Sequence, residues 1–211
     1  MFLTDFTYFG SISFVQQLLK QSQITFDTQA AFTKMSFKNR MVLTTSQGPL
    51  KLTIPIVGGR DQKAPMHEIL IDYTSPWMEQ HIKAIRTSYK RAPYFEYYEQ
   101  TLDALYLNKQ EKLIDFLWSC QFWLKDQLKA PWEILPMNQA TEAATTSQNN
   151  DLTTNNKYFS PWQPNNYEQC ANLPNYQQVF LDKVGFIPNV CILDMLFCCG
   201  GKQVNKLLRT I

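Results

Sequence analysis

Residues 1–28, MFLTDFTYFGSISFVQQLLKQSQITFDT, combine a short apolar stretch, an aromatic turn, a helical pattern and a second β-prone stretch. Apolar residues recur at helical spacing in residues 11–21, and Ser11 or Ser13 is a suitable N-cap for this helix. Residues 24–28 have the composition of a strand. A strand, a helix and a second strand in this order are typical of the start of an α/β unit.

The chain beyond this opening has the pattern of a β-hairpin and then of several helices. Residues 41–45 and 50–56 are β-prone and flank a turn signal at residues 46–49. Residues 67–72 predict another strand, and helical patterns follow over 75–91, 93–106 and 109–128. Towards the end of the sequence we expect a strand at 176–181 and helices at 190–199 and 202–208, the first of them capped by Asn189.

This order of elements predicts one α/β domain over residues 1–211. We expect a small Rossmann-like, mostly parallel sheet, with the 41–56 hairpin inserted and the helices of 75–128 forming one layer. An α+β fold with an antiparallel sheet is the alternative, and it applies if the hairpin belongs to the central sheet. Residues 138–157 are rich in Thr, Asn, Gln and Ala, and we expect them to form a solvated, mobile loop.

Composition excludes several classes of protein. The chain has 211 residues, 45% of them hydrophobic and 18% charged, with a formal net charge of +2. The aromatic content of 14% supplies a core, so general disorder is excluded. The apolar stretch 190–199 is shorter than the roughly 20 residues of a membrane span. Near-neutral charge gives no reason to expect a nucleic-acid partner.

The first residues and the cysteines indicate a cytoplasmic protein with reduced thiols. Met1 is followed by no basic segment and Asp5 comes early, so we expect no secretory signal. Five cysteines without regular spacing argue against a disulfide scaffold. The two histidines, His67 and His81, have no apparent third ligand nearby, and no metal site is expected.

Two polar residues lie in apolar helical patterns. His81 falls between Trp77 and Ile85 on one helical face, either as a core histidine bonded to a carbonyl or tyrosine, or as a general base near neutral pH. Asp194 interrupts an apolar run, so it faces solvent or has a definite partner such as Arg40 or a tyrosine.

A series of short motifs resembles the WbqC-like family, bacterial proteins associated with surface-polysaccharide clusters. The matches run in family order along most of the chain: Tyr8-Phe9, Ile12-Ser13-Phe14, Phe37-Lys38-Asn39-Arg40, Gly48-Pro49, Leu52-Thr53-Ile54-Pro55, Trp77, His81, Ile85, Tyr89-Lys90, Ala92-Pro93-Tyr94-Phe95, Tyr176-Gln177, Phe180, Gly185-Phe186-Ile187-Pro188-Asn189, Ile192-Leu193-Asp194-Met195-Leu196-Phe197 and Gly200.

The chain departs from this family pattern at its beginning. Many family members have a His-Gln-Pro-x-Tyr-x-Pro-Trp-like segment after the first strand. Residues 4–10, TDFTYFG, occupy that place here and contain no histidine. Any chemistry of the family histidine is therefore either absent from this chain or carried by another group.

The resemblance implies a transferase that moves an acyl or aminoacyl group to an activated sugar in surface-polysaccharide biosynthesis. Its substrate would be a small molecule such as a nucleotide sugar, and no cofactor is identified. We expect His81 to carry a proton and Asp194 to orient a partner. Substrate-binding residues would be Asn39, Arg40, Tyr89 and Tyr94. We expect these four residues to converge with His81 and Asp194 on one cleft.

A non-catalytic binding or assembly protein is the alternative. The matched residues would then be structural, and His81 and Asn39-Arg40 would satisfy buried polar groups. The missing family histidine favours this alternative. Sequence alone assigns no oligomeric state.

Overall fold

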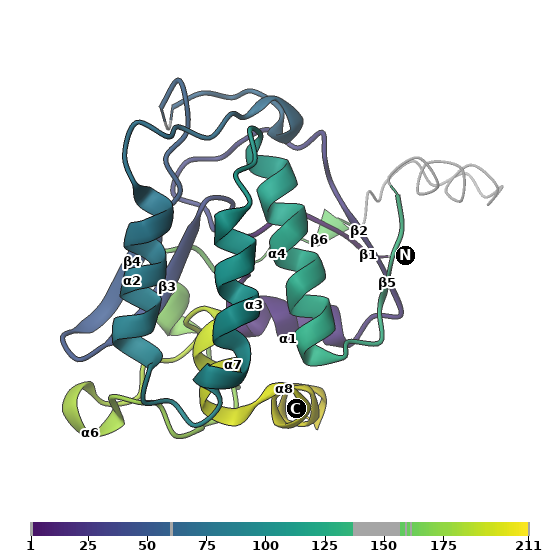
Figure 1. Cartoon of the computed structure of the whole chain (residues 1–211). Coiled ribbons are helices and arrows are strands. Elements are labelled where there is room, and N and C mark those ends of the chain that lie inside the picture. The colour runs from purple at the N-terminus through teal and green to yellow at the C-terminus, as the bar shows by residue number, and fades with distance from the viewer. Residues whose placement is uncertain (1, 60, 137–156, 159, 161, 211) are drawn as a thin grey trace, which may run out of the picture.

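The computed structural model describes residues 2–59, 61–136, 157, 158, 160 and 162–210. The expected loop at 138–157 therefore lies outside the described residues, except for Lys157, which begins a strand. Figure 1 shows several helices packed beside a small sheet at one side of the molecule.

The four-stranded sheet is parallel, as the opening strand–helix–strand pattern predicts. It contains β1 (Phe2–Thr4), β2 (Gln23–Phe26), β5 (Glu133–Ile134) and β6 (Lys157–Tyr158) in the order β5-β2-β1-β6. Phe2 pairs with Ile24 and Leu3 with Lys157, so the carboxyl ends of all four strands lie at one edge. The strands β5 and β6 were missed from the sequence because two residues carry no periodicity.

The hairpin is a separate sheet. It consists of β3 (Arg40–Thr45) and β4 (Gly48–Thr53), which pair antiparallel from Arg40↔Thr53 to Thr45↔Gly48. The described chain is thus a mixed α/β fold with a small parallel sheet, an antiparallel hairpin and several helices. The finer expectation of a Rossmann-like layer stays a prediction.

The helices agree with the sequence patterns, except for a short helix at Leu181–Val184 that no pattern predicted. They are α1 (Ile12–Leu19), α2 (Trp77–Tyr89), α3 (Phe95–Leu107), α4 (Leu113–Leu128), α6 (Leu181–Val184), α7 (Ile192–Cys199) and α8 (Gly201–Thr210). Ser11 is the N-cap of α1, and its hydroxyl accepts from the Phe14 N–H at 3.4 Å. Short 3₁₀ turns occur at Met66–Glu68 and Tyr167–Gln169.

Three local predictions are wrong. Residues 67–72 form a 3₁₀ turn and isolated bridges in place of a strand, and 176–181 form an irregular segment that leads into α6. Asn189 does not cap α7, whose N-cap is Cys191. The Asn189 side-chain oxygen instead accepts from the Ser13 N–H at 2.8 Å, because tertiary packing brings Asn189 to the start of α1.

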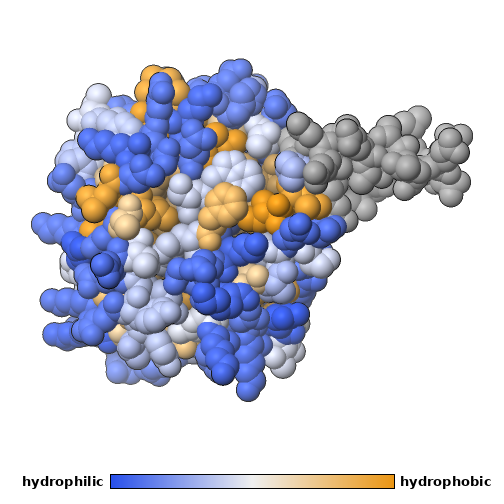
Figure 2. All heavy atoms as spheres, turned by 45° about the vertical axis from the view of Figure 1, so that its right-hand side comes forward, coloured by the Kyte–Doolittle hydropathy of each residue, from blue (hydrophilic) through white to orange (hydrophobic). Residues whose placement is uncertain are grey.

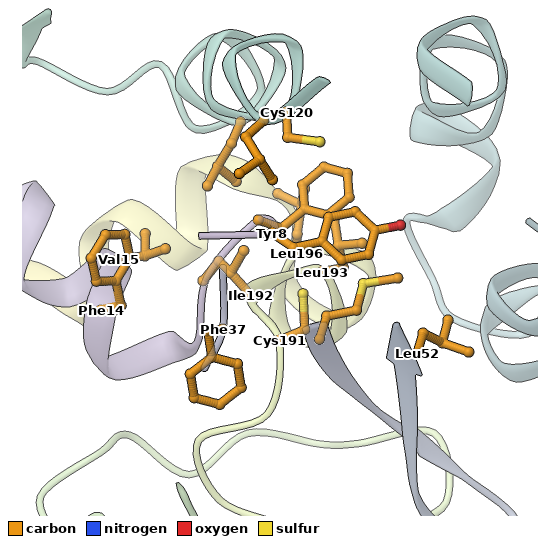
Figure 3. Packing of buried hydrophobic residues seen from close by; sticks show 14 of the residues in the cluster. Tyr8, Phe14, Val15, Phe37, Leu52, Cys120, Cys191, Ile192, Leu193 and Leu196 are labelled. Atoms are coloured by element: carbon orange, nitrogen blue, oxygen red, sulfur yellow. The ribbon is translucent and has the colours of Figure 1, made fainter. Parts of the chain in front are cut away.

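The helix α7 passes through the centre of the core. The start of α7 is hydrogen-bonded to the hairpin and to the segment before α1. The Cys191 N–H donates to the Val42 carbonyl of β3, and the Ile192 N–H donates to the Gly10 carbonyl. Figure 3 shows apolar residues of this helix beside Tyr8 and Cys120, from segments far apart in the sequence. The core therefore joins the parallel sheet, the hairpin and the helical layer into one packed unit.

The surface has a mixed character. Figure 2 shows a band of apolar side chains across the middle of one face, with mostly hydrophilic side chains above and below it. Phe122 of α4 is 54% exposed and stacks on Trp118. Among the helices of the described residues, none combines the length and apolarity that a membrane crossing requires.

Candidate functional site

A crevice opens at the carboxyl ends of β1 and β6. From β1 the chain passes through α1 to β2, which pairs with one side of β1. The later strand β6 pairs with the other side of β1. The strand order therefore reverses between β1 and β6. Ligands of open α/β sheets bind outside the carboxyl ends of strands at such a reversal. Segments that follow the two strands line the crevice together with α1 and the segment before the hairpin: Thr4, Asp5, Phe6, Thr7, Phe14, Ser36, Phe37, Lys38, Ser160, Trp162 and Gln163.

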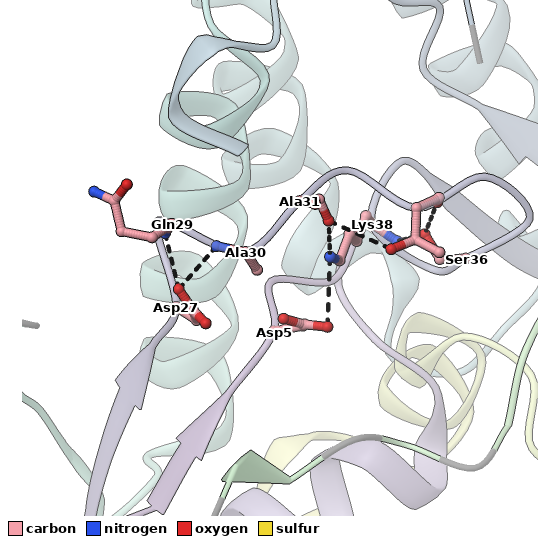
Figure 4. Close-up of polar contacts among 8 residues, drawn as sticks. Asp5, Asp27, Gln29, Ala30, Ala31, Ser36 and Lys38 are labelled. Carbon is pink, nitrogen blue, oxygen red and sulfur yellow. Dashed lines mark hydrogen bonds and ion pairs between the residues drawn. The ribbon is translucent and has the colours of Figure 1, made fainter. Parts of the chain in front are cut away.

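A nearly buried ion pair lies in this crevice. The Lys38 Nζ lies 3.5 Å from the Asp5 Oδ2, with only 5% of the lysine side chain and 22% of the aspartate side chain exposed. The ammonium also donates to the Ala31 carbonyl at 2.7 Å (Figure 4). Because an ammonium withdrawn from water is costly unless it is paired, these partners hold Lys38 in a defined position.

Thr7 presents a polar group without a partner beside this pair. Its carbonyl accepts from the Gln121 Nε2 at 2.8 Å, which fixes the backbone. Its hydroxyl is buried and has no hydrogen-bond partner among the described residues. The Thr7 side chain therefore adds a polar group to the wall of the crevice, beside Asp5 and Lys38.

The neighbouring strand end shows a different use of an aspartate. Asp27 follows β2, and its Oδ1 accepts from the N–H groups of Gln29 at 2.8 Å and Ala30 at 2.9 Å (Figure 4). This is an Asx-type turn. Asp27 does not line the crevice, so the two aspartates at the same sheet edge differ in role.

Asp194 lies in a closed interior network. The Tyr89 hydroxyl donates to its Oδ2 at 2.7 Å, and the Tyr176 hydroxyl and the Gln178 Nε2 donate to its Oδ1 at 2.6 and 3.2 Å. Burial raises the pKa of Asp194, and the hydrogen bonds from the tyrosines oppose that rise. Of the alternatives open from the sequence, a tyrosine partner is confirmed, and Arg40 is not the partner.

His81 lies in a second interior chain of hydrogen bonds. Its Nδ1 lies 3.0 Å from the Tyr8 hydroxyl, which also bonds the Tyr106 hydroxyl, and its ring bonds the Thr53 backbone. Burial lowers the pKa of His81 to about 4. The imidazole is therefore neutral at pH 7, with one nitrogen protonated and the other an acceptor. This geometry matches the core histidine considered from the sequence.

The remaining predicted site residues are dispersed. Asn39 holds the hairpin, since its Nδ2 donates to the Ile54 carbonyl at 2.8 Å. The Arg40 guanidinium lies against the Met35 sulfur, and Tyr94 is 46% exposed on a different groove.

Of the six predicted site residues, Asp194 and Tyr89 are joined by a hydrogen bond, and Asn39 and Arg40 are neighbours in the chain. The expected convergence of all six on one cleft is not observed. Their catalytic and binding roles stay predictions.

The crevice residues were not selected from the sequence. Asp5 comes directly after the first strand, and this position could have indicated it, because parallel strands present ligands at their carboxyl ends. Lys38 falls in the family motif at residues 37–40, but its burial beside Asp5 depends on the packing of the segment before the hairpin.

The structure gives no metal-binding cluster within the part of the chain that it describes. There, no three His, Cys, Asp or Glu side chains lie close enough to hold an ion. All five cysteines are free thiols, as expected from their spacing.

Comparisons with known proteins agree with the sequence motifs. The chain is 33% identical over 111 residues to Uncharacterized protein Rv1507c of Mycobacterium tuberculosis, a match that covers 52% of this chain and 45% of that protein. The chain thus aligns with less than half the length of this relative. No solved structure matches the chain. The family model of the WbqC-like protein family matches residues 7–206, and the chain therefore belongs to this family.

Proposed function

We propose that the crevice at the carboxyl ends of β1 and β6 is the substrate site of a cytoplasmic transferase. The enzyme would move an acyl or aminoacyl group onto the amine of an activated sugar, such as a nucleotide sugar, in surface-polysaccharide biosynthesis. Family membership supports the pathway by association only. The Lys38–Asp5 ion pair in the crevice carries the proposal for the site.

The two charged groups suit the two demands of acyl transfer. The acceptor amine attacks the carbonyl carbon of an activated acyl donor, and Asp5 takes the proton that the amine loses as the new N–C bond forms. The Lys38 ammonium stabilises the negative charge that develops on the carbonyl oxygen. The bond to the leaving group then breaks, and that group departs with the electron pair.

The lining also offers groups that suit a sugar. Trp162 and Phe37 supply aromatic surface, and the Thr7 hydroxyl supplies an unused hydrogen-bonding group. Ligand sites in proteins commonly combine such apolar walls with a few fixed polar groups. The crevice has a volume of about 60 Å³, so it would admit only the amine group and its nearest atoms, with the rest of the substrate outside it.

An acyl-transfer assay tests this proposal. The protein is incubated with amino-sugar nucleotides and a panel of acyl thioesters and aminoacyl donors, and the product is detected by mass spectrometry as the mass added to the sugar. We expect transfer with one pair of substrates. Asp5→Asn should lower kcat by roughly 10²–10⁴-fold, the usual contribution of a general base.

Asp27→Asn is the matched control, because Asp27 follows the neighbouring strand and does not line the crevice. Its turnover should equal that of the wild type. No transfer with any pair, or equal losses in both variants, would contradict the proposed function.

A binding or assembly protein is the second candidate. It is favoured by the two interior networks, because His81 and Asp194 already have hydrogen-bond partners within the protein. A structural role for these residues requires no contact with a ligand. The His81→Gln variant separates the two candidates. A lower stability with unchanged specific activity supports a structural His81, whereas a stable and inactive variant supports catalysis by this residue.

A further inference from the structure

A large groove lies away from the crevice, at the junction of α3, α4 and α8. It has a volume of about 670 Å³, which is within the usual range for small-molecule sites. None of its lining residues lines the crevice at the sheet edge.

The wall and floor of this groove are held by hydrogen bonds and tight packing. The Gly201 N–H donates to the Tyr98 hydroxyl at 2.8 Å, and the Asn205 Nδ2 donates to the Leu128 carbonyl at 3.0 Å. A Cβ at Gly201 would lie 2.1 Å from the Gln127 carbonyl oxygen, so the start of α8 packs directly on the end of α4. The groove is therefore a formed feature of the fold.

Tyrosine rings form one wall. Tyr94 and Tyr97 are 46% and 73% exposed, and Tyr97 packs edge-on against Tyr98 with ring centroids 4.8 Å apart. A Cβ at Gly200 would come within 2.9 Å of the Tyr94 ring, which shows how closely that ring covers the glycine. Exposed aromatic faces held in this way suit the stacking of a flat ring.

Lysines also line the groove. Lys129, Lys202 and Lys206 line the groove, and no carboxylate does. Lys129 pairs with Asp126 at 2.9 Å. Lys202 and Lys206 form no ion pair with any described residue. Their two positive charges are therefore available to an anion in the groove.

We propose that this groove binds a nucleoside phosphate, with the base on the exposed tyrosine rings and the phosphate on Lys202 and Lys206. A flat ring joined to an anion uses both the tyrosine rings and the lysines, whereas a nucleoside uses only the rings and inorganic phosphate uses only the lysines. This ligand is additional to the substrate of the crevice, and neither proposal depends on the other. Tyr94 would contact a ligand here, as the sequence suggested, but at a second site.

Isothermal titration calorimetry of the full chain tests the proposal. The probes are UMP and AMP, with uridine, adenosine and inorganic phosphate as fragments, at low and high salt. We expect at least one nucleotide to bind at least tenfold more tightly than either of its fragments. Its affinity should fall at high salt, because exposed lysines hold the phosphate.

Variants locate the binding site. The double variant Lys202→Ala/Lys206→Ala and Tyr97→Ala should each weaken nucleotide binding by about tenfold, the order of a base–aromatic stack. Lys51→Ala, at an exposed lysine of β4, and Tyr97→Phe, which keeps the ring, are the matched controls and should bind as the wild type does. The melting temperature of each variant establishes that it is folded.

Several results would overturn the proposal. The first is that neither nucleotide binds. The second is that inorganic phosphate binds as tightly as the nucleotide. The third is that the lysine double variant binds the nucleotide with unchanged affinity. None of these results bears on acyl transfer at the crevice, since the two sites share no lining residue.

Discussion

The interior networks and the sheet-edge crevice both bury polar side chains, but they differ in how those side chains are satisfied. Asp194 accepts hydrogen bonds from Tyr89, Tyr176 and Gln178, and its helix passes through the core. Lys38 and Asp5 pair at the wall of an opening, beside a Thr7 hydroxyl without a partner.

This difference separates residues that stabilise the fold from residues that are placed to bind. A hydrogen-bonded network in the closed interior contributes specificity and stability to the core. A charged pair next to an unused hydroxyl in a crevice offers hydrogen-bonding capacity to a ligand. The following changes test the contrast, from the largest expected effect to the smallest.

Asp194→Ala should produce the largest loss of stability. It leaves the hydroxyls of Tyr89 and Tyr176 without their acceptor in the core, whereas the Gln178 Nε2 keeps the Ile187 carbonyl. Loss of a buried network of this kind costs about 3–5 kcal/mol. Urea unfolding at pH 7 measures it, and a loss below about 1 kcal/mol would contradict a structural role for the network.

Asp194→Asn sharpens that test through its pH dependence. The pKa of Asp194 is raised by burial above its ordinary value of 3.8, so the folded chain retains a proton that the unfolded chain releases. The contribution of this carboxyl to stability is therefore fully present below pH 3.8 and is lost as pH rises through the higher pKa of the folded state. The wild type should gain stability over Asp194→Asn as pH falls from 7 to 4.

His81 should show the opposite pH dependence. Its pKa falls from 6.5 to about 4 on burial, so between these values the unfolded chain binds a proton that the folded chain does not. Stability from this residue is therefore lost as pH falls from 6.5 to 4, by about 3 kcal/mol. The His81→Gln variant should lack this component, and an unchanged pH profile would show that His81 is not the titrating group.

Lys38→Met should have a smaller effect on stability than on binding. Asp5 is partly exposed, so water can replace its lost partner, and we expect a cost of about 2 kcal/mol. Lys34→Met is the matched control, since Lys34 pairs with Asp61 at 2.9 Å with both side chains largely exposed. It should change the free energy of unfolding by less than about 1 kcal/mol.

Arg86→Ala should have the smallest effect. Arg86 of α2 pairs with Glu99 and Asp103 of α3, and its side chain is 46% exposed. Exposed ion pairs of this kind contribute about 0–1 kcal/mol. A loss above about 2 kcal/mol would mean that the α2–α3 contact depends on this network.

The fold was largely predictable because its helices are long and amphipathic. The patterns over 75–91 and 109–128 gave α2 and α4, and the turn at 46–49 gave the hairpin. The prediction of strands at 67–72 and 176–181 is wrong. Alternation of apolar and polar residues over six positions does not distinguish a strand from an irregular segment held by packing. Asn189 was assigned to the wrong helix, since its partner Ser13 is 176 residues away.

The candidate site was less predictable than the fold. Asp194 and Tyr89 were selected separately, and the structure joins them. His81 was identified as a buried residue of α2, but its partners Tyr8 and Tyr106 come from two other segments. The Lys38–Asp5 pair depends on a contact between residues 33 positions apart, which a single sequence does not display.

The most direct test of the central claim is ligand-induced stabilisation of three proteins: the wild type, Lys38→Met and His81→Gln. A panel of amino-sugar nucleotides and acyl donors is screened by thermal shift. A ligand at about 100 times its Kd adds roughly 2.7 kcal/mol, which raises Tm by several degrees at this chain length. We predict a shift that Lys38→Met abolishes and His81→Gln retains. A shift that persists in Lys38→Met and disappears in a folded His81→Gln would place the ligand at the interior network and contradict the assignment of the crevice.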